Sequence, residues 1–387
     1  MNICILSQRY PYKDNMEFVF VKKLVDEWAK MGHQCTVVTM FSLTTFLRKR
    51  IKYKPRYYQY EVSSGTIVKV FNPRFISFQK TSIKGVSLDD WVSARMFERL
   101  MRRLDNDFDV IYCHFFITAL TAFRYAKKND IPLFVATGES QVPLLKKPYA
   151  SFRWEDFRDY TKGVISVSGK NVIEAVEKEY ADENKCRVFP NATDTSIFKP
   201  LNKADCRKKL GYPDDVFIIA CVGFFCERKG QNRVLEAVRK LREPKIRLIF
   251  LGTPAKIGSV DVEGEEILFK GSVDNGALPV YLAASDIFCL PTLAEGCCNA
   301  IIEALACGLP IVSSDLPFNK DILDESNSIL VDPTNTDELA LTIQKLMNTP
   351  SLCSELAMGS LSKGESLDIR RRASDILQFM DERKQLR

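Results

Sequence analysis

Residues 285–314 read SDIFCLPTLAEGCCNAIIEALACGLPIVSS, an order that predicts a strand, a loop, a helix and a second strand. The apolar runs Ile287–Leu290 and Ile311–Ser314 are typical of buried strands, and a Gly-Leu-Pro between them ends the helix. Two carboxylates follow the first strand, Glu295 in the loop and Glu303 in the helix. Ligands bind at the carboxyl ends of strands in α/β sheets, and the start of a helix attracts anions. The stretch therefore predicts a site for a sugar phosphate, with one glutamate at each end of it.

The chain has 387 residues, which is more than one hydrophobic core usually supports, so we expect two domains. Its 46% hydrophobic and 27% charged residues are ordinary for a soluble globular protein. No apolar run reaches about 18 residues, so no membrane-spanning helix is predicted. The start, MNICILSQRY, lacks the basic head and cleavage site of a signal peptide, which favours the cytoplasm.

The twelve cysteines are interpreted as small core residues, because many of them lie in apolar segments. The sequence has no Cys-x-x-Cys pair and only two histidines, His33 and His114, so a zinc site is not expected. So many thiols without an export signal fit a reducing cytosol. We predict no metal site and no cofactor.

Strand and helix patterns alternate along the whole chain, which predicts parallel sheets with helices on both faces. The polar stretch 191–200 interrupts the alternation and is interpreted as a linker. The expected fold is α/β with two doubly wound, Rossmann-like domains facing across a cleft. We place the N-terminal domain at 1–195, the C-terminal domain at 196–361 and a final helix, packing back on the first domain, at 362–387. The predicted strands are 3–7, 35–40, 67–71, 109–113, 132–137, 163–166, 216–224, 246–251, 267–269, 287–290, 311–313 and 329–331, and the predicted helices of the first half are 18–31, 91–104, 118–127 and 170–180.

Charge differs between the two halves. Residues 1–195 carry 31 Lys and Arg against 22 Asp and Glu, a net charge of +9, whereas the remainder carries 24 against 27, a net −3. This asymmetry suggests that the N-terminal half faces an anionic partner.

The first strand of the second half ends at Gly223 and is followed by the loop FFCERKG. Gly223 lets the backbone approach a ligand, and Arg228 and Lys229 put two cations beside the next helix start, which suits a diphosphate. A solvated Arg-Lys pair in a turn is the simpler interpretation of these two residues alone. Neither GxGxxG nor GxxxxGK[ST] occurs, so the dinucleotide fingerprint and the P-loop are excluded.

Taken together, these motifs resemble the GT-B-fold retaining glycosyltransferases of family 4, also called glycosyl transferases group 1. The shared features are the Glu-x7-Glu pair of Glu295 and Glu303, an Ala-x-Gly-x-Pro-Val segment at 306–312, a Pro-Asn-x-x-Asp motif at 190–194, Val-Gly at 222–223 with Lys-Gly at 229–230, Tyr-Pro at 10–11 and Gly-His at 32–33.

The resemblance implies a glycosyltransferase that moves a hexosyl group from a nucleoside diphosphate sugar to a saccharide or lipid-linked acceptor, in cell-surface polysaccharide synthesis. It implies that Lys229, helped by Arg228, neutralises the donor diphosphate and that Glu295 contacts the donor sugar. It also implies that Glu303 binds the nucleotide ribose and that His114 approaches the sugar. The backbone of Gly223 and of a four-residue run is expected to bind donor oxygens. That run is Gly296, Cys297, Cys298 and Asn299.

The sequence departs from the family pattern at Phe224, where an arginine often follows the Val-Gly. We take Arg228 as the replacement for that second phosphate contact. No Asp-x-Asp motif occurs, so the mechanism is expected to need no metal. Two alternatives remain open at this point: a GT-B-fold sugar-nucleotide epimerase, and a catalytically weak sugar-nucleotide-binding subunit.

Residues 46–60 (FLRKRIKYKPRYYQY) interleave cations with aromatic residues and contain no acid. We interpret them as a peripheral face that binds an anionic membrane, where lipid-linked acceptors are reached on the inner side of the cell membrane. A solvated loop is the simpler alternative, and a nucleic-acid surface is not favoured. The cations of this stretch are Arg48, Lys49, Arg50, Lys52, Lys54 and Arg56.

Overall fold

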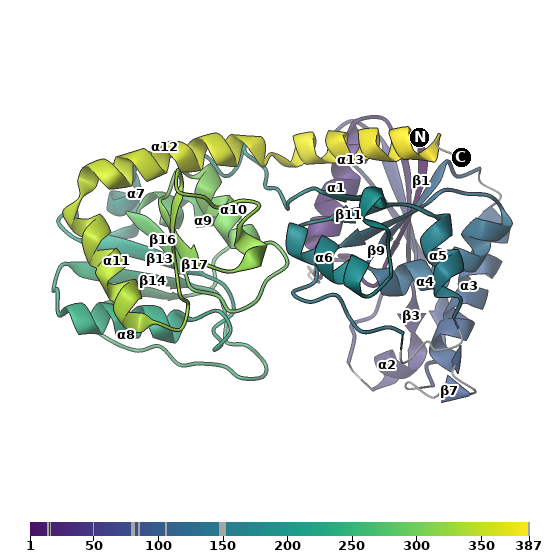
Figure 1. The fold of residues 1–387 in the computed structure, drawn as a ribbon, viewed down its shortest axis with the longest axis horizontal. Helices are drawn as coiled ribbons and strands as arrows, with labels where there is room; N and C mark the ends of the chain where they lie inside the picture. The colour runs from purple at the N-terminus through teal and green to yellow at the C-terminus, as the bar shows by residue number, and fades with distance from the viewer. Residues whose placement is uncertain are drawn as a thin grey trace. The chain divides into compact units, whose positions relative to one another are not determined.

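The computed structural model describes residues 1–13, 15, 17–48, 50–78, 82–83, 86–104, 107–146 and 152–385. Two compact units share the chain (Figure 1). The N-terminal unit consists of Met1–Phe189 together with Arg372–Arg387, and the C-terminal unit is Pro190–Arg371. Both units are α/β structures built on a parallel sheet, as the sequence predicts.

The N-terminal unit contains an eight-stranded sheet in the order β12-β11-β10-β9-β1-β2-β5-β4, parallel except for the antiparallel β4–β5 pair. Chain order reverses between β1 and β9, so the carboxyl ends of these two strands, at Ser7 and His114, lie side by side. The strands are β1 (Asn2–Ser7), β2 (Gln34–Thr39), β4 (Tyr57–Glu61), β5 (Ile67–Phe71), β9 (Val110–His114), β10 (Leu133–Thr137), β11 (Thr161–Ser166) and β12 (Cys186–Val188), and two small two-stranded sheets pair β3 (Phe41–Ser42) with β6 (Arg74–Phe75) and β7 (Ser82–Ile83) with β8 (Val86–Ser87).

Helices cover both faces of this sheet because successive residues of its central strands are buried, and successive residues point to opposite faces. Ile3 and Ile5 of β1 join one core cluster with residues of α1 and α13, whereas Cys4 and Leu6 join a second cluster with residues of α3 and α4. The helices are α1 (Val19–Lys30), α2 (Leu43–Leu47), α3 (Leu88–Leu104), α4 (Phe116–Lys128), α5 (Trp154–Tyr160), α6 (Gly169–Glu177), the 3-10 turn η1 (Glu183–Lys185) and α13 (Ile369–Lys384).

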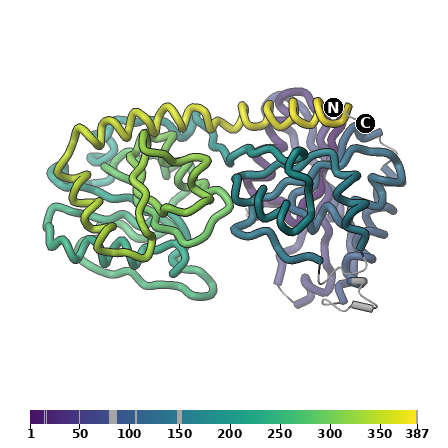
Figure 2. Tube along the Cα trace, viewed as in Figure 1, coloured from purple at the N-terminus to yellow at the C-terminus, as the bar shows by residue number. Residues whose placement is uncertain are grey.

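The last helix is an integral part of the N-terminal unit, although it follows the C-terminal unit in the sequence. The indole N–H of Trp28 in α1 donates a hydrogen bond to the carbonyl oxygen of Ala373 at 3.0 Å. A Cβ added at Gly163 of β11 would lie 2.7 Å from the ring of Phe379, so a glycine here lets α13 lie directly on the sheet. The chain start and the end of α13 consequently lie close together (Figure 2).

The C-terminal unit contains a six-stranded parallel sheet in the order β15-β14-β13-β16-β17-β18. Its strands are β13 (Phe217–Val222), β14 (Ile246–Leu251), β15 (Ile267–Gly271), β16 (Ile287–Leu290), β17 (Ile311–Ser314) and β18 (Ser328–Val331). Its helices are α7 (Lys203–Leu210), α8 (Gln231–Leu241), α9 (Leu278–Ala283), α10 (Asn299–Ala306), the 3-10 turn η2 (Pro317–Asn319), α11 (Thr336–Asn348) and α12 (Pro350–Ser366). All six strands were predicted within about two residues at each end.

Several elements of the N-terminal unit were not predicted. They are the helices α2 and α5, the edge strands β4 and β12, the short strands β3, β6, β7 and β8 and the turn η1. Strand β4 begins inside the stretch 46–60, which we interpret from the sequence as a membrane-facing surface. The signal for β4 is an alternation of period two: Tyr58 and Tyr60 are half-buried, whereas Tyr57, Gln59 and Glu61 are exposed. In the part of the chain that the structure describes, no helix has the combination of length and apolarity needed to cross a bilayer.

Candidate active site

The sheet of the C-terminal unit reverses its order between β13 and β16, which lie next to each other. Such a switch point is where α/β sheets bind ligands, at the carboxyl ends of the strands. The loop that follows β13 carries Gly223, Arg228 and Lys229, and the loop that follows β16 carries Glu295. The fold therefore brings the two motifs that the sequence singled out to the same place.

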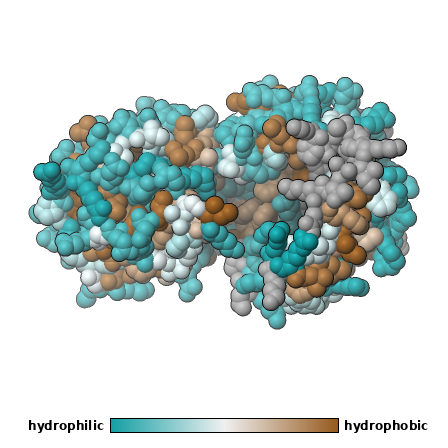
Figure 3. All heavy atoms as spheres, turned by 90° about the horizontal axis from the view of Figure 1, so that it is seen from below, coloured by the Kyte–Doolittle hydropathy of each residue, from teal (hydrophilic) through white to brown (hydrophobic). Residues whose placement is uncertain are grey.

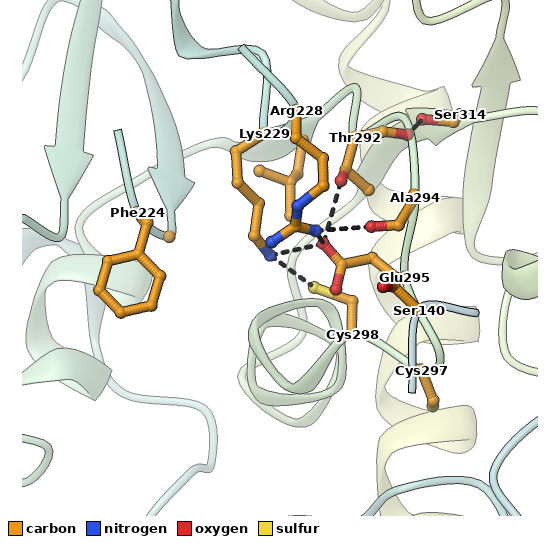
Figure 4. Close-up of polar contacts among 12 residues, drawn as sticks. Ser140, Phe224, Arg228, Lys229, Thr292, Ala294, Glu295, Cys297, Cys298 and Ser314 are labelled. Atoms are coloured by element: carbon orange, nitrogen blue, oxygen red, sulfur yellow. Dashed lines mark hydrogen bonds and ion pairs between the residues drawn. The ribbon is translucent and has the colours of Figure 1, made fainter. Parts of the chain in front are cut away.

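A single carboxylate oxygen of Glu295 contacts both predicted cations, Lys229 and Arg228 (Figure 4). The Nζ of Lys229 lies 2.7 Å from Oε1 of Glu295, and Nη1 of Arg228 lies 2.5 Å from the same oxygen. Arg228 also donates to the carbonyl oxygen of Ala294, and the hydroxyl of Thr292 donates to Glu295 at 3.0 Å. The carboxylate is thus held by three donors from two loops. Thr292 was not predicted to take part, although it lies in the Pro-Thr turn after β16.

Lys229 is a buried cation, with 8% of its surface exposed. Burial lowers the pKa of a lysine, but the Cys298 sulfur and the Glu295 carboxylate outweigh it, and the pKa of Lys229 is raised above its ordinary value. Because burial also raises the pKa of Cys298, that group is a neutral thiol near pH 7. Glu295 is therefore the charge that keeps Lys229 protonated in its buried position.

Two glycines shape the first loop around Lys229. Gly223 has φ 151°, and a Cβ there would lie 3.2 Å from both Cδ and Cε of Lys229, so the missing side chain leaves room for the lysine stem. Gly230 has φ 83° and starts α8, and a Cβ there would lie 2.8 Å from the carbonyl oxygen of Pro291. Any other residue at Gly230 would force the two loops apart.

Arg233 of α8 fastens these loops together and was not singled out from the sequence. It donates to the carbonyl oxygens of Glu227 and Pro291, each at 2.8 Å, and is itself 7% exposed. The bond to Pro291 connects α8 with the end of β16. Arg233 also forms an ion pair with the carboxylate of Glu227 at 2.6 Å. A positioning residue of this kind gives no signal in a single sequence, because the bond that joins the two loops goes to a backbone carbonyl distant in the chain.

The other predicted donor-binding residues surround the start of α10. Gly296, Cys297 and Cys298 are buried, whereas Asn299 is exposed at the first helical position. The Nδ2 of Asn191, from the predicted linker motif, donates to the carbonyl oxygen of Cys297 at 3.1 Å. Glu303 is half-buried one turn further along α10. Burial raises the pKa of Cys307 to about 12, and the charge of Glu303 is the second cause of this rise.

Phe224 occupies the position where the resembled family often has an arginine. Its side chain is 60% exposed and lies apart from the cluster around Lys229 (Figure 4). Arg228 instead provides the second cation at Glu295, with 41% of its side chain exposed. That Arg228 takes over a phosphate contact stays a prediction.

His114 lies in the N-terminal unit, at the carboxyl end of β9, and is 7% exposed. Its ring is surrounded by aromatic side chains, with centroids at 4.4 Å for Phe115 and 5.1 Å for Phe20. Burial, and then the charge of Arg372, lowers its pKa to about 3, so the imidazole is neutral. Within the described residues, neither ring nitrogen has a hydrogen-bond partner. Its predicted contact with the sugar stays a prediction.

The cations of the basic stretch 46–60 differ in how far they are exposed. Arg48, Arg50, Lys52 and Arg56 are exposed, and Lys49 lies outside the described residues. Lys54 does not belong to the surface: it is 7% exposed and its Nζ donates to the carbonyl oxygen of Tyr10. The prediction that Lys54 contributes to a membrane-facing surface is therefore wrong, because its charge is satisfied inside the unit.

Two protein-family models match the chain, one in each half. The model described as Glycosyltransferase Family 4 matches residues 18–197, and the model described as Glycosyl transferases group 1 matches residues 202–359. The second match contains the whole cluster around Lys229 and Glu295. The two matches together span nearly the entire chain.

Relatives and solved structures agree with this assignment. A glycosyltransferase of Bacillus subtilis named for teichuronic acid biosynthesis, TuaC, is 25% identical over 89% of each chain. The Escherichia coli UDP-Gal:alpha-D-GlcNAc-diphosphoundecaprenol alpha-1,3-galactosyltransferase is 24% identical over 71% of this chain and 76% of its own. The crystal structure of Anabaena HepE in complex with UDP superposes with a TM-score of 0.72 at 16% identity, covering 99% of this chain and all of the other. The protein is a GT-B-fold glycosyltransferase of family 4, as the motifs around Gly223, Lys229, Glu295 and Glu303 predicted.

Proposed function

We propose that this enzyme transfers a hexosyl group from a nucleoside diphosphate sugar to a saccharide or lipid-linked acceptor, with retention of the anomeric configuration, in cell-surface polysaccharide synthesis. The observation that carries the proposal is the buried Lys229, held beside the start of α10 by Glu295. The names of the relatives support the choice of pathway, since one refers to teichuronic acid and another to a diphosphoundecaprenol-linked sugar. HepE, whose structure contains UDP, supports a nucleotide donor.

The cluster around Lys229 has the charge pattern that a diphosphate requires. A buried lysine without a counter-ion would lose its proton, so Glu295 maintains the positive charge until the donor arrives. The diphosphate would then share Lys229 and Arg228 with Glu295, and the free N–H groups at the start of α10 would face its oxygens. Glu295 would at the same time accept hydrogen bonds from hydroxyls of the sugar, and Glu303 from those of the ribose.

In the proposed reaction, the bond between the anomeric carbon and the diphosphate oxygen breaks as the acceptor oxygen attacks from the same face. The acceptor proton passes to an oxygen of the departing phosphate. Negative charge grows on the leaving diphosphate, and preorganised cations stabilise such charge more in the transition state than in the ground state. Lys229 and Arg228 supply this charge, so we keep the prediction that no metal is required.

A screen of donors tests the proposal. Purified protein is mixed with UDP-, GDP-, ADP- and dTDP-sugars, and thermal unfolding is followed. A donor present at about 100 times its Kd stabilises the folded protein by about 2.7 kcal/mol. One nucleotide is expected to give this shift, and slow release of the corresponding nucleoside diphosphate without acceptor is expected from a competent transferase.

The family assignment favours a transferase over an epimerase or an inactive binding subunit. A donor that binds without being hydrolysed, even when candidate acceptors are added, would contradict the proposed activity. Formation of an epimeric sugar nucleotide would contradict it as well.

A further inference from the structure

A pocket of about 510 Å³ in the N-terminal unit is lined by four arginines and has no carboxylate in its lining. It lies between the edge strand β4, strands β5 and β6, and helix α3. Arg56 and Arg74 come from the strand side, and Arg99 and Arg103 come from α3. The sequence singled out Arg56 as part of a basic stretch but gave no sign of a pocket, because the four residues are spread over 48 positions, from 56 to 103.

The arginines of α3 fall into two groups, those close to a carboxylate and those that line the pocket. Arg95 and Arg102 lie within 4.0 Å of the carboxylate of Glu98, at 4.0 Å and 3.7 Å. Arg99 and Arg103, by contrast, form no ion pair with any residue in the described ranges, and the same is true of Arg56. Among the described residues, Glu98 thus pairs with two arginines of the helix, and the two arginines that line the pocket have no counter-ion.

Arg74 forms the floor of this arrangement and is fixed in place. Its guanidinium lies 3.8 Å from the centre of the Phe41 ring and donates to the carbonyl oxygen of Lys54. Its Nη1 is buried and, within the described residues, has no hydrogen-bond partner. Burial lowers the pKa of Arg74, and the charge of Arg56 lowers it further, so the bound state of the pocket would relieve repulsion between like charges.

Guanidinium groups in such numbers match phosphate oxygens, which they bind in pairs of parallel hydrogen bonds. The remaining wall of the pocket is apolar or aromatic. The ring centroids of Tyr57 and Phe71 are 4.9 Å apart, and Met96 and Leu100 come from α3, as do Arg99 and Arg103. A phosphate attached to an apolar body therefore fits this pocket better than a free anion does.

Exposed apolar side chains lie on the pocket helix α3 and on the segments next to Arg56 and Arg74 in the chain. Tyr53, whose ring lies 5.5 Å from the Arg74 guanidinium, is 61% exposed. Trp91, on the same helix as Arg99, is 51% exposed. Figure 3 shows hydrophobic atoms on the N-terminal unit from the side on which α2 and β7 lie in Figure 1. The other large exposed apolar residues of this region are Leu47, Ile76 and Phe78, and the exposed cations are Arg48, Arg50 and Lys52.

We propose that the four-arginine pocket binds the phosphate group of an anionic phospholipid, and that the exposed aromatic side chains around it enter the headgroup layer of the membrane. Aromatic rings favour that depth, and basic residues near an anionic surface each add attraction. The proposal goes beyond the general membrane partner considered from the sequence, because it assigns recognition to a built pocket and removes Lys54 from it.

The test is co-sedimentation of the full chain with vesicles of phosphatidylcholine, alone or mixed with phosphatidylglycerol. The pocket variant is Arg99→Gln with Arg103→Gln. The matched control is Arg102→Gln with Arg153→Gln, which removes the same charge from two exposed arginines outside the pocket. Affinity for the mixed vesicles is expected to fall at least ~30-fold in the pocket variant, because hydrogen bonds between charged groups are lost. In the control variant the affinity is expected to stay within ~3-fold of the wild type.

Two further arms separate the alternatives. Arg99→Lys with Arg103→Lys keeps the charge but not the paired geometry, and is expected to bind with intermediate affinity. Equal losses in the pocket and control variants would show attraction by charge alone and overturn the pocket. A thermal shift with inorganic phosphate or glycerol 3-phosphate that requires Arg99 and Arg103, without vesicle binding, would assign the pocket to a soluble phosphate and overturn the lipid.

This inference rests on the proposed action on a membrane-linked acceptor, and its failure can be distinguished from a failure of that function. Each variant is also tested for stabilisation by UDP, whose proposed site is in the C-terminal unit. Unchanged UDP stabilisation with no vesicle binding in the wild type would reject the pocket and leave the donor site standing. Vesicle binding that depends on the pocket, with no stabilisation by UDP, would support the lipid pocket and reject the proposed donor site.

Discussion

The Nζ of Lys229 and Oε1 of Glu295 are 2.7 Å apart, although 66 residues separate them in the chain. Only 10% of the lysine side chain and 14% of the glutamate side chain are exposed. Removing one member of a buried pair leaves the other charge uncompensated, so each side chain is the counter-ion of the other. This dependence gives the first two predictions.

Lys229→Ala is expected to lower kcat/KM by about 10²–10³-fold, because it removes one preorganised charge from the leaving diphosphate. The donor identified by the screen is used for steady-state kinetics. Lys240→Ala is the control, since Lys240 forms an exposed pair with Asp337 on the same unit. Turnover by Lys229→Ala equal to that of the wild type would remove this lysine from the mechanism.

Glu295→Gln is expected to make nucleotide binding sensitive to alkaline pH. Without the carboxylate, burial dominates and the pKa of Lys229 falls, so its charge is lost at a lower pH than in the wild type. UDP affinity is measured by calorimetry between about pH 7 and about pH 9.5. A steeper loss is expected in the variant than in the wild type or in Glu263→Gln, which removes an exposed carboxylate elsewhere. Parallel pH profiles would argue against the proposed role of Glu295.

The pair of Lys229 and Glu295 also makes the free energy of unfolding depend on pH at alkaline values. The pKa of Lys229 is raised in the folded state, so its contribution to the free energy of unfolding is fully present below the ordinary lysine pKa of about 10.4. That contribution is lost as the pH rises through the raised value.

His114 is expected to contribute to acid destabilisation. Its folded pKa of about 3 lies below the unfolded value of about 6.5, so the unfolded chain binds an additional proton between these values. Stability therefore falls as the pH drops from about 6.5 towards 3.

His114→Phe should reduce the loss of stability between about pH 7 and about pH 4.5, measured by urea unfolding. His33→Gln is the comparison, because His33 is less buried than His114. An acid response of His114→Phe that matches the wild type would show that the imidazole is protonated in the folded protein.

Phe224→Arg is expected to increase UDP affinity by about 10-fold, because a hydrogen bond between two charged groups contributes about 1.5–3 kcal/mol. The new guanidinium would extend from the loop that carries Gly223 and Lys229. Phe224→Gln is the matched control that removes the aromatic ring without adding charge. If both variants bind UDP alike, position 224 does not face the phosphates and Arg228 alone supplies the second cation.

The sequence by itself determined the architecture and the motifs of the candidate site. Apolar strands alternating with helices predict a parallel sheet, and the residues after β13 and β16 then meet at a switch point, which is why Lys229 and Glu295 could be placed in one site in advance, although their ion pair was not predicted. These signals are local, since each depends on a run of neighbouring residues with a fixed period or spacing.

Tertiary structure decided what depends on distant partners. Three such contacts are the hydrogen bond of Trp28 to Ala373, by which the predicted final helix packs on the N-terminal unit, that of Arg233 to the carbonyl of Pro291 and that of Lys54 to the carbonyl of Tyr10. The pocket of Arg56, Arg74, Arg99 and Arg103 likewise exists only once β4, β6 and α3 are packed together. A single sequence shows the charge of such residues, but burial and the nearest oppositely charged group decide what that charge does, and both are properties of the folded chain.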